Sequence, residues 1–184
     1  SAQTWWNGNI SSDWIDGANW SGDVVPLATD DVIIPDVVND PVIMAGTAAV
    51  AKSVTVQSGG SLTIDPMCSL TINGSGPDGI FNDGVIMNRG ILSIGSLTST
   101  KLYGIRNIGT FTNDTDGEIN INRTTSIGLY NYGTFNNAAK IIIGATANVG
   151  AYGLQNSVGI FNNNTGGDII INRSSIYGVL IHSG

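Results

Sequence analysis

The second half of the chain carries short apolar runs and polar residues in a pattern that returns about every 25 residues. Each repeat opens with a glycine, and these glycines are spaced 25, 24, 25 and 25 residues apart: Gly79, Gly104, Gly128, Gly153 and Gly178. Within a repeat, two short runs end in Asn and a third alternates along its length. Runs of this kind, separated by Gly, Asn or Asp, are typical of β-strands joined by tight turns. Each repeat therefore predicts three short strands.

A period near 25 residues with three strands per repeat predicts a right-handed parallel β-helix, in which one repeat forms one coil. A propeller blade needs about 40 residues, and alternation with a period of two leaves no amphipathic helix. One coil cannot bury its own apolar side chains, so stacked coils bury matching positions in columns. We expect three inward columns: Ile80, Ile105, Leu129 and Leu154; Ile86, Phe111, Phe135 and Phe161; Ile94, Ile121, Ile143 and Ile171.

Two further columns consist of asparagine. Asn tolerates the left-handed backbone that tight corners require, and stacked amides can hydrogen-bond along a column. We therefore expect structural ladders with Asn at the corners of the coils: Asn82, Asn107, Asn131 and Asn156; Asn88, Asn113, Asn137 and Asn163. Glu118, Lys140 and Asp168 should form a charged column, in which opposite signs are neighbours.

Residues 31–78 are less regular but carry the same strand pattern, for example in Leu62–Ile64 and Leu70–Ile72. We expect about six coils in all, with 79–184 as the regular repeats. Alternate coils resemble each other most, at offsets of 49 and 50 residues, so two coils form a duplicated unit. The extra residue is expected as a bulge near Ser157–Val158.

Residues 1–30 are expected to cap the first coil, because the open end of a β-helix exposes its core and unpaired backbone. All four tryptophans lie here: Trp5, Trp6, Trp14 and Trp20. A glycan-stacking platform is the alternative reading of this cluster. We expect a single domain, 1–184, that ends part-way into a coil. The natural polypeptide should then be longer, with further domains.

The opening segment contains a series of short motifs: Trp6-Asn7-Gly8, Ser12-Asp13-Trp14, Asn19-Trp20, Val25-Pro26 and Asp30–Pro35. In residues 5–35 the chain resembles the amino-terminal opening of secreted bacterial β-helix surface proteins, of the pectin-lyase-like and adhesin type. The resemblance implies export to the cell surface or the extracellular space. It also implies adhesive or polysaccharide-processing relatives.

The amino-acid composition excludes several classes of function. The net charge is −7 and only 11% of residues are charged, against roughly 25% in an average domain. Without a basic run, nucleic acid is an unsuitable partner, and no apolar stretch reaches membrane-spanning length. Cys68 and His182 are each the single residue of their type. We expect Cys68 to be a small buried hydrophobe, and neither a zinc site nor a Cys–His pair can be built.

We expect no cofactor and no metal site, with one candidate for calcium in Asp114, Asp116 and Glu118. Oxygen-rich loops of this kind hold Ca²⁺, although Asp-Gly is equally ordinary turn chemistry. No carboxylate pair has the register that glycoside hydrolysis requires. The sequence therefore predicts no catalytic residues, and it leaves the binding residues undetermined.

The leading functional hypothesis is a non-catalytic structural or adhesive module of a larger secreted or cell-surface bacterial protein. Its expected partners are surface glycans or other proteins. The alternative is a carbohydrate-active β-helix, either a polysaccharide lyase or hydrolase or a glycan-binding domain. Two outward residues, Ile142 and Ile170, suggest an adhesive strip on one face. The sequence leaves the oligomeric state open, and stacking of the uncapped carboxyl end against another copy is one of the alternatives.

Overall fold

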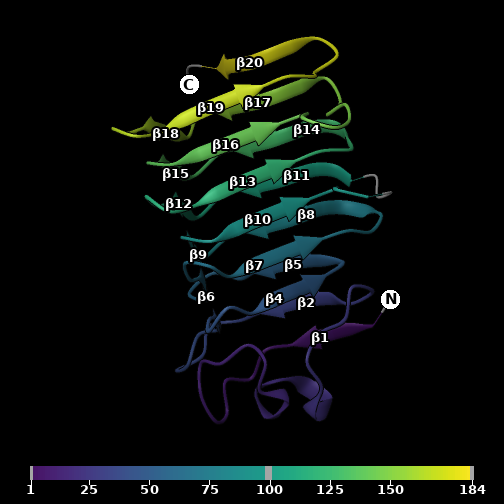
Figure 1. Cartoon of the computed structure of the whole chain (residues 1–184), viewed down its shortest axis with the longest axis vertical. Helices are drawn as coiled ribbons and strands as arrows, with labels where there is room; N and C mark the ends of the chain where they lie inside the picture. The colour runs from purple at the N-terminus through teal and green to yellow at the C-terminus, as the bar shows by residue number, and fades with distance from the viewer. Residues whose placement is uncertain (1, 98–100, 183–184) are drawn as a thin grey trace.

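The computed structural model describes residues 2–97 and 101–182, and they form a right-handed parallel β-helix. In Figure 1 the chain climbs from the amino terminus at the bottom, with the nearer strands running to the right and the farther strands returning to the left. Within the described residues, helix is confined to two three-residue 3-10 turns, η1 (Gly17–Asn19) and η2 (Ser21–Asp23). The predicted fold and the near absence of helix are confirmed.

Three parallel sheets form the sides of the rod, and every coil contributes one strand to each of them. The first sheet contains β1 (Gln3–Trp5), β2 (Asp31–Ile34), β5 (Ser53–Val56), β8 (Gly76–Asn82), β11 (Lys101–Asn107), β14 (Thr124–Asn131), β17 (Tyr152–Ser157) and β20 (Tyr177–His182). The second contains β3 (Val42–Ile43), β6 (Ser61–Ile64), β9 (Val85–Asn88), β12 (Thr110–Asn113), β15 (Thr134–Asn137) and β18 (Ile160–Asn163). The third contains β4 (Ala48–Ala51), β7 (Ser69–Ile72), β10 (Ile91–Ile94), β13 (Glu118–Ile121), β16 (Lys140–Ile143) and β19 (Asp168–Ile171). The described strands thus make six complete coils, β2 to β19, with β1 and β20 beyond them.

The apolar columns lie in the core as expected, because the four-residue strands from β2 to β16 bury their second and fourth side chains, and only the last coil, with β18 and β19, leaves these positions partly open. Ile80, Ile105, Leu129 and Leu154 stand in register across the first sheet. In the second sheet the Phe111 and Phe135 rings stack 4.8 Å apart at 9°, and Phe161 continues the stack at 5.1 Å. Each such side chain contributes about 1.5–3 kcal/mol through burial.

The asparagine ladders are present as expected, at or beside the ends of the strands, but their residues do not take the left-handed backbone that was expected of them. In four-residue strands such as β9 and β12 the ladder Asn is the fourth residue, and its side chain points into the rod. None of the ladder asparagines has a positive φ angle. The Nδ2 of Asn82 donates to Oδ1 of Asn107 at 2.7 Å, and the same amide reaches the Thr110 carbonyl at 3.0 Å. Burial therefore selects Asn here, because a primary amide supplies both the donor and the acceptor that a stacked polar column needs.

The duplicated two-coil unit is visible in the corners. Arg123 donates from one guanidinium nitrogen to the Gly95 and Ser96 carbonyls of the preceding coil, at 3.0 and 2.8 Å. Arg173, 50 residues later, makes the equivalent bond to the Gly144 carbonyl at 2.8 Å. The extra residue lies where it was expected, since Asn131 pairs with Asn156 whereas Thr134 pairs with Ile160. Val158 takes a φ of 54° in that turn.

Three of the four tryptophans fill the amino-terminal end of the rod. Trp6, Trp14 and Trp20 are buried, and their rings meet edge-to-face at 4.8 and 4.7 Å. The indole of Trp6 donates to the Asn39 carbonyl at 2.6 Å, and that of Trp20 to the Trp14 carbonyl at 2.8 Å. These buried rings have no open face on which a sugar could stack. Trp5, on β1, is 39% exposed.

Candidate ligand-binding face on the first sheet

All five tyrosines of the chain gather on or beside the outer side of the first sheet, which we call the tyrosine face: Tyr103, Tyr130, Tyr132, Tyr152 and Tyr177. Their direction follows from the backbone. A Cβ on Gly104 or Gly153 would meet the core side chains of Ile121 and Ile171, so the tyrosine before each glycine points outward. Tyr130 lies between the buried Leu129 and Asn131 and points outward as well.

The rings pack on one another across neighbouring coils. Tyr103 stacks on Tyr130 with centroids 5.4 Å apart, and Tyr152 stacks on Tyr177 at 6.0 Å. Tyr132, in the turn after β14, meets Tyr130 edge-to-face at 4.6 Å. Because each ring is held by another ring, the tyrosine face is ordered before any ligand arrives.

The hydroxyl groups of two of these tyrosines also interact with each other. The phenol oxygens of Tyr130 and Tyr132 share a short hydrogen bond. Burial, and then this hydrogen bond, raise the pKa of Tyr130 to about 12. That phenol therefore stays neutral across the physiological range and can both donate and accept hydrogen bonds.

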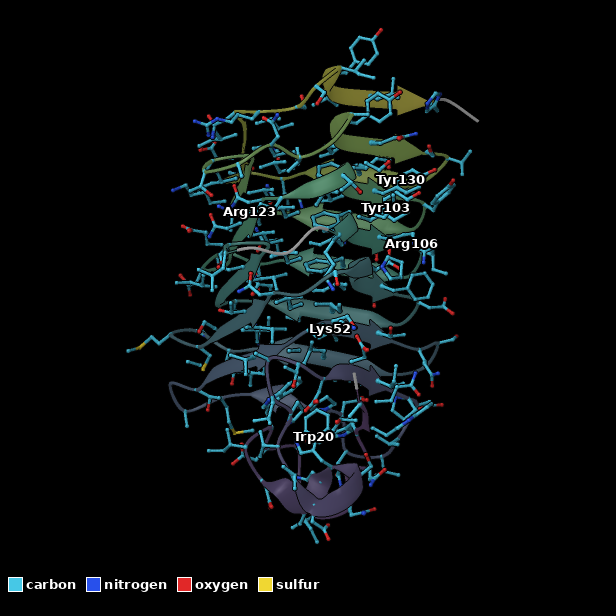
Figure 2. The ribbon with its side chains drawn as sticks, turned by 90° about the vertical axis from the view of Figure 1, so that its right-hand side faces the viewer. Trp20, Lys52, Tyr103, Arg106, Arg123 and Tyr130 are labelled. Carbon is cyan, nitrogen blue, oxygen red and sulfur yellow. The ribbon has the colours of Figure 1, made fainter. Side chains whose placement is uncertain are left out.

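Arg106 joins the tyrosine face to the coil below it. Its guanidinium lies over the Phe81 ring at 4.5 Å and over Tyr103 at 5.6 Å, both within cation–π range. The same group binds Asp78 with two bonds, Nε to Oδ1 at 2.9 Å and a terminal nitrogen to Oδ2 at 2.7 Å. The hydrogen bond to Asp78 is the main reason that the pKa of Arg106 is raised. Figure 2 shows Lys52, Arg106, Tyr103 and Tyr130 at increasing heights along the rod.

A pocket of about 270 Å³ lies at the foot of the tyrosine face, and we call it the ledge pocket. It exists because the first sheet widens: β2 and β5 have four residues each, whereas β8 and β11 have seven. The added residues Gly76–Asp78 overhang the narrower strands below. The polar residues that line the pocket are Gln3, Asp31, Lys52, Ser53, Thr55, Asp78 and Lys101.

Lys101 is the unusual residue of the ledge pocket, because only 1% of it is exposed. Its Nζ donates to the Lys52 carbonyl at 2.7 Å. Burial, and then the like charge of Lys52, lower the pKa of Lys101 to about 8. A lysine of this kind could not be recognised from the sequence, where lysine normally indicates an exposed position.

Two of the three predicted calcium ligands are engaged with other groups. Asp114 pairs with Arg89 at 3.1 Å, and a backbone bond from Thr115 together with Arg89 lowers the pKa of Asp114. Glu118 pairs with Lys140 at 3.7 Å, within the expected charged column, and Asp116 is exposed. Among residues 2–97 and 101–182, no group of three or more His, Cys, Asp or Glu side chains could hold a metal ion.

The remaining sequence candidates lie apart from the tyrosine face. Cys68 is buried as expected, and His182 is exposed on β20. Ile142 and Ile170 are half-buried neighbours on the outer side of the third sheet. At the carboxyl end of the described coils, Phe161, Ile169 and Val179 line an apolar hollow of about 390 Å³.

None of the helices in the described part of the chain is long and apolar enough to cross a membrane.

No curated protein and no solved structure matches the chain. The sequence pattern of one family, described as a domain of unknown function (DUF8693), matches residues 5–140. That range is well over half of the chain, and it includes the tryptophan cluster, the ledge pocket and the first three tyrosines. The chain therefore belongs to the DUF8693 family.

Proposed function

We propose that the chain is a non-catalytic adhesive module of a larger secreted or cell-surface protein, and that its tyrosine face binds a glycan chain. The observation that carries the proposal is the gathering of all five tyrosines on one side of the rod. The hydrophobic core contains none of the five tyrosines, so core packing does not account for the cluster. Binding gives it a reason.

Tyrosine suits a sugar because it combines an apolar ring face with a hydroxyl group. Because the rings stack face to face between coils, a sugar on the outer side meets their apolar edges, and their hydroxyl groups meet the hydroxyls of the sugar. Parallel strands lie about 4.8 Å apart, a spacing close to the length of one sugar unit. A glycan lying along the rod axis would therefore meet about one strand per sugar.

Rigidity supports an adhesive role. The asparagine ladders and the stacked phenylalanines tie each coil to the next, so the rings on the tyrosine face move together with the rod. Binding to a preorganised surface loses less conformational entropy than binding to mobile side chains. The same rigidity would let the module hold neighbouring domains away from a cell surface.

A polysaccharide-processing enzyme is the second candidate, and Lys101 is the observation that favours it. An amine whose pKa lies at about 8 is partly neutral near physiological pH, and a neutral amine can act as a base. Against this, the two carboxylates of the ledge pocket are held in ion pairs with Lys52 and Arg106. That arrangement suits recognition better than proton transfer.

The test compares three proteins on immobilised polysaccharides: the native chain, Tyr130→Ala/Tyr152→Ala, and Thr112→Ala/Asn136→Ala. The third is the matched control, since its two residues lie in outward positions of the second sheet. We expect the tyrosine variant to lose roughly 5-fold or more in affinity per ring, at about 1 kcal/mol each, and the control to bind like the native chain. Equal binding by all three proteins would contradict the proposal, and release of oligosaccharides would favour the enzyme.

A further inference from the structure

Both carboxylates that line the ledge pocket are bound by cations or donors other than Lys101. Asp31 is bound by Lys52 at 3.2 Å and accepts from the Ser53 hydroxyl at 2.6 Å. Asp78 is bound by both donor positions of Arg106. Each of the two carboxylates is thus bound by a cation other than Lys101, and among the described residues neither forms an ion pair with the Lys101 ammonium.

The Lys101 ammonium lacks the partners that a buried charge normally has. An ammonium has three hydrogens to donate, and within the described residues it has one hydrogen-bond acceptor, the Lys52 carbonyl. Burial and the like charge of Lys52 lower the pKa of Lys101, and the nearby carboxylates of Asp31 and Asp78 offset this only in part. An anion in the ledge pocket would stabilise the charged ammonium.

Two glycines with unusual backbone angles lie beside Lys52 and Lys101. Gly74 and Gly76 have φ angles of 145° and 153°, which side-chain-bearing residues rarely adopt. A Cβ on Gly74 would lie 2.5 Å from Cγ of Lys52, and a Cβ on Gly76 would lie 3.5 Å from Nζ of Lys101. Gly74 therefore leaves the room that the Lys52 side chain occupies, whereas a Cβ on Gly76 would be in ordinary contact with the Lys101 ammonium.

The ledge pocket and the tyrosine face form one continuous surface. Tyr103 stands directly above Asp78 in the register of the first sheet. Arg106 binds Asp78 and lies over the Tyr103 ring, so one side chain belongs to both regions. A ligand chain that leaves the tyrosine face toward the amino terminus reaches the ledge pocket next.

We infer that the ledge pocket binds a singly charged anionic oxygen group, a carboxylate, sulfate ester or phosphodiester, carried by the glycan on the tyrosine face. The inference rests on the proposed function and names the chemical class of its ligand. One negative charge on the ligand forms an ion pair with the Lys101 ammonium. The ligand oxygens accept hydrogen bonds from the N–H groups of that ammonium that do not bind the Lys52 carbonyl.

The charge state of Lys101 makes this binding depend on pH. The charged groups around it are Asp31 from β2, Lys52 before β5, Asp78 from β8 and Arg106 from its own strand. Below about pH 8 the free pocket holds the ammonium, which attracts the anion. As the pH rises through about 8 the ammonium is lost, so the affinity for an anionic glycan falls while that for a neutral glycan stays constant.

The experiment measures calorimetric affinity for two oligosaccharides with the same backbone, one anionic and one with its acidic groups chemically reduced to neutral ones. At pH 6.5 the native chain should prefer the anionic form by at least 10-fold, and Lys101→Met should remove the preference without weakening the neutral form. Lys140→Met, an exposed lysine on the third sheet, is the control and should keep the preference. Equal binding of both forms by the native chain, or a preference retained in Lys101→Met, would overturn the inference.

A second measurement does not depend on glycan binding or on a stable variant. Reductive methylation of the native chain at several pH values reports the pKa of each lysine by mass spectrometry. Acetate, methyl sulfate or dimethyl phosphate should raise the apparent pKa of Lys101 and leave Lys140 unchanged, and the most effective anion identifies the group. If none of the three shifts Lys101, the inference fails. If no glycan binds but the anions shift Lys101, the proposed function alone fails.

Discussion

The coils below β8 and the coils from β8 upward fill the same inward positions with different kinds of side chain. The lower coils fill their inward positions with aliphatic residues such as Val56 and Ile64, and the tryptophan cluster closes their end. The upper coils place buried asparagines at the same positions of the register, since Val56 pairs with Asn82 and Ile64 with Asn88. A β-helix therefore accepts either an apolar or an amide column, as long as the column is continuous.

The boundary between the two regions shows what an amide column requires. Oδ1 of Asn82 and Oδ1 of Asn88 are buried without a hydrogen-bond partner among the described residues, because the aliphatic side chains below them have no donor. An unsatisfied buried acceptor costs about 1–3 kcal/mol. Each further rung restores both a donor and an acceptor, so the ladder is unfavourable to begin and favourable to extend.

The largest effect is expected from Phe135→Ala in the upper region. Its ring lies between Phe111 and Phe161, and its removal opens a cavity across three coils. We expect the free energy of unfolding to fall by about 3–5 kcal/mol. Urea denaturation followed by circular dichroism measures it, and a loss below about 1 kcal/mol would mean that the stack is not part of the core.

Asn131→Ala should rank second. It leaves Oδ1 of Asn156 without its donor and removes the acceptor of Asn107, both inside the rod. Asn107 keeps two backbone carbonyls as acceptors, so we expect a loss of about 2–3 kcal/mol. The same denaturation experiment applies. A neutral substitution would show that the ladder contributes no stability.

The boundary itself offers a matched pair of variants. Val56→Asn places an amide directly below Asn82 and supplies the donor that its Oδ1 lacks, whereas Val54→Asn buries an amide below Ile80. Both substitutions are unfavourable, but Val56→Asn should be the milder by about 1–2 kcal/mol. Equal losses in denaturation midpoint would contradict the explanation of the boundary.

The smallest effect is expected from Lys140→Met. Its ion pair with Glu118 spans 3.7 Å between exposed side chains, so solvent screens it. The unfolding free energy should change by less than about 0.5 kcal/mol at 0.15 M salt. A larger change would mean that the charged column, rather than the apolar and amide columns, holds the upper coils together.

Most of the fold could be predicted from the sequence, because the alternation of inward and outward residues repeats with the coil. The columns that contain Ile105, Phe111 and Ile121 followed directly from that repeat. The left-handed backbone predicted for the asparagines was wrong, because Asn is compatible both with a left-handed turn and with a buried ladder in extended backbone. Sequence alone does not separate these two uses.

The candidate site was not predicted. Tyr103, Tyr152 and Tyr177 recur at coil spacings of 49 and 25 residues, which was a usable signal, but Ile127 interrupts their column. The ledge pocket depends on how far β8 and β11 extend beyond β5, and strand length is poorly marked in a Gly-rich segment. Only the stacked coils place Lys101 beside the Lys52 carbonyl, 49 residues away.

A crystal structure of the chain with its best-binding oligosaccharide tests the central claim most directly. The account predicts sugar rings against Tyr130 and Tyr152, with the glycan running along the rod axis and an acidic group within hydrogen-bond distance of the Lys101 ammonium. An oligosaccharide bound instead on the second or third sheet, or against Trp5 alone, would contradict the account.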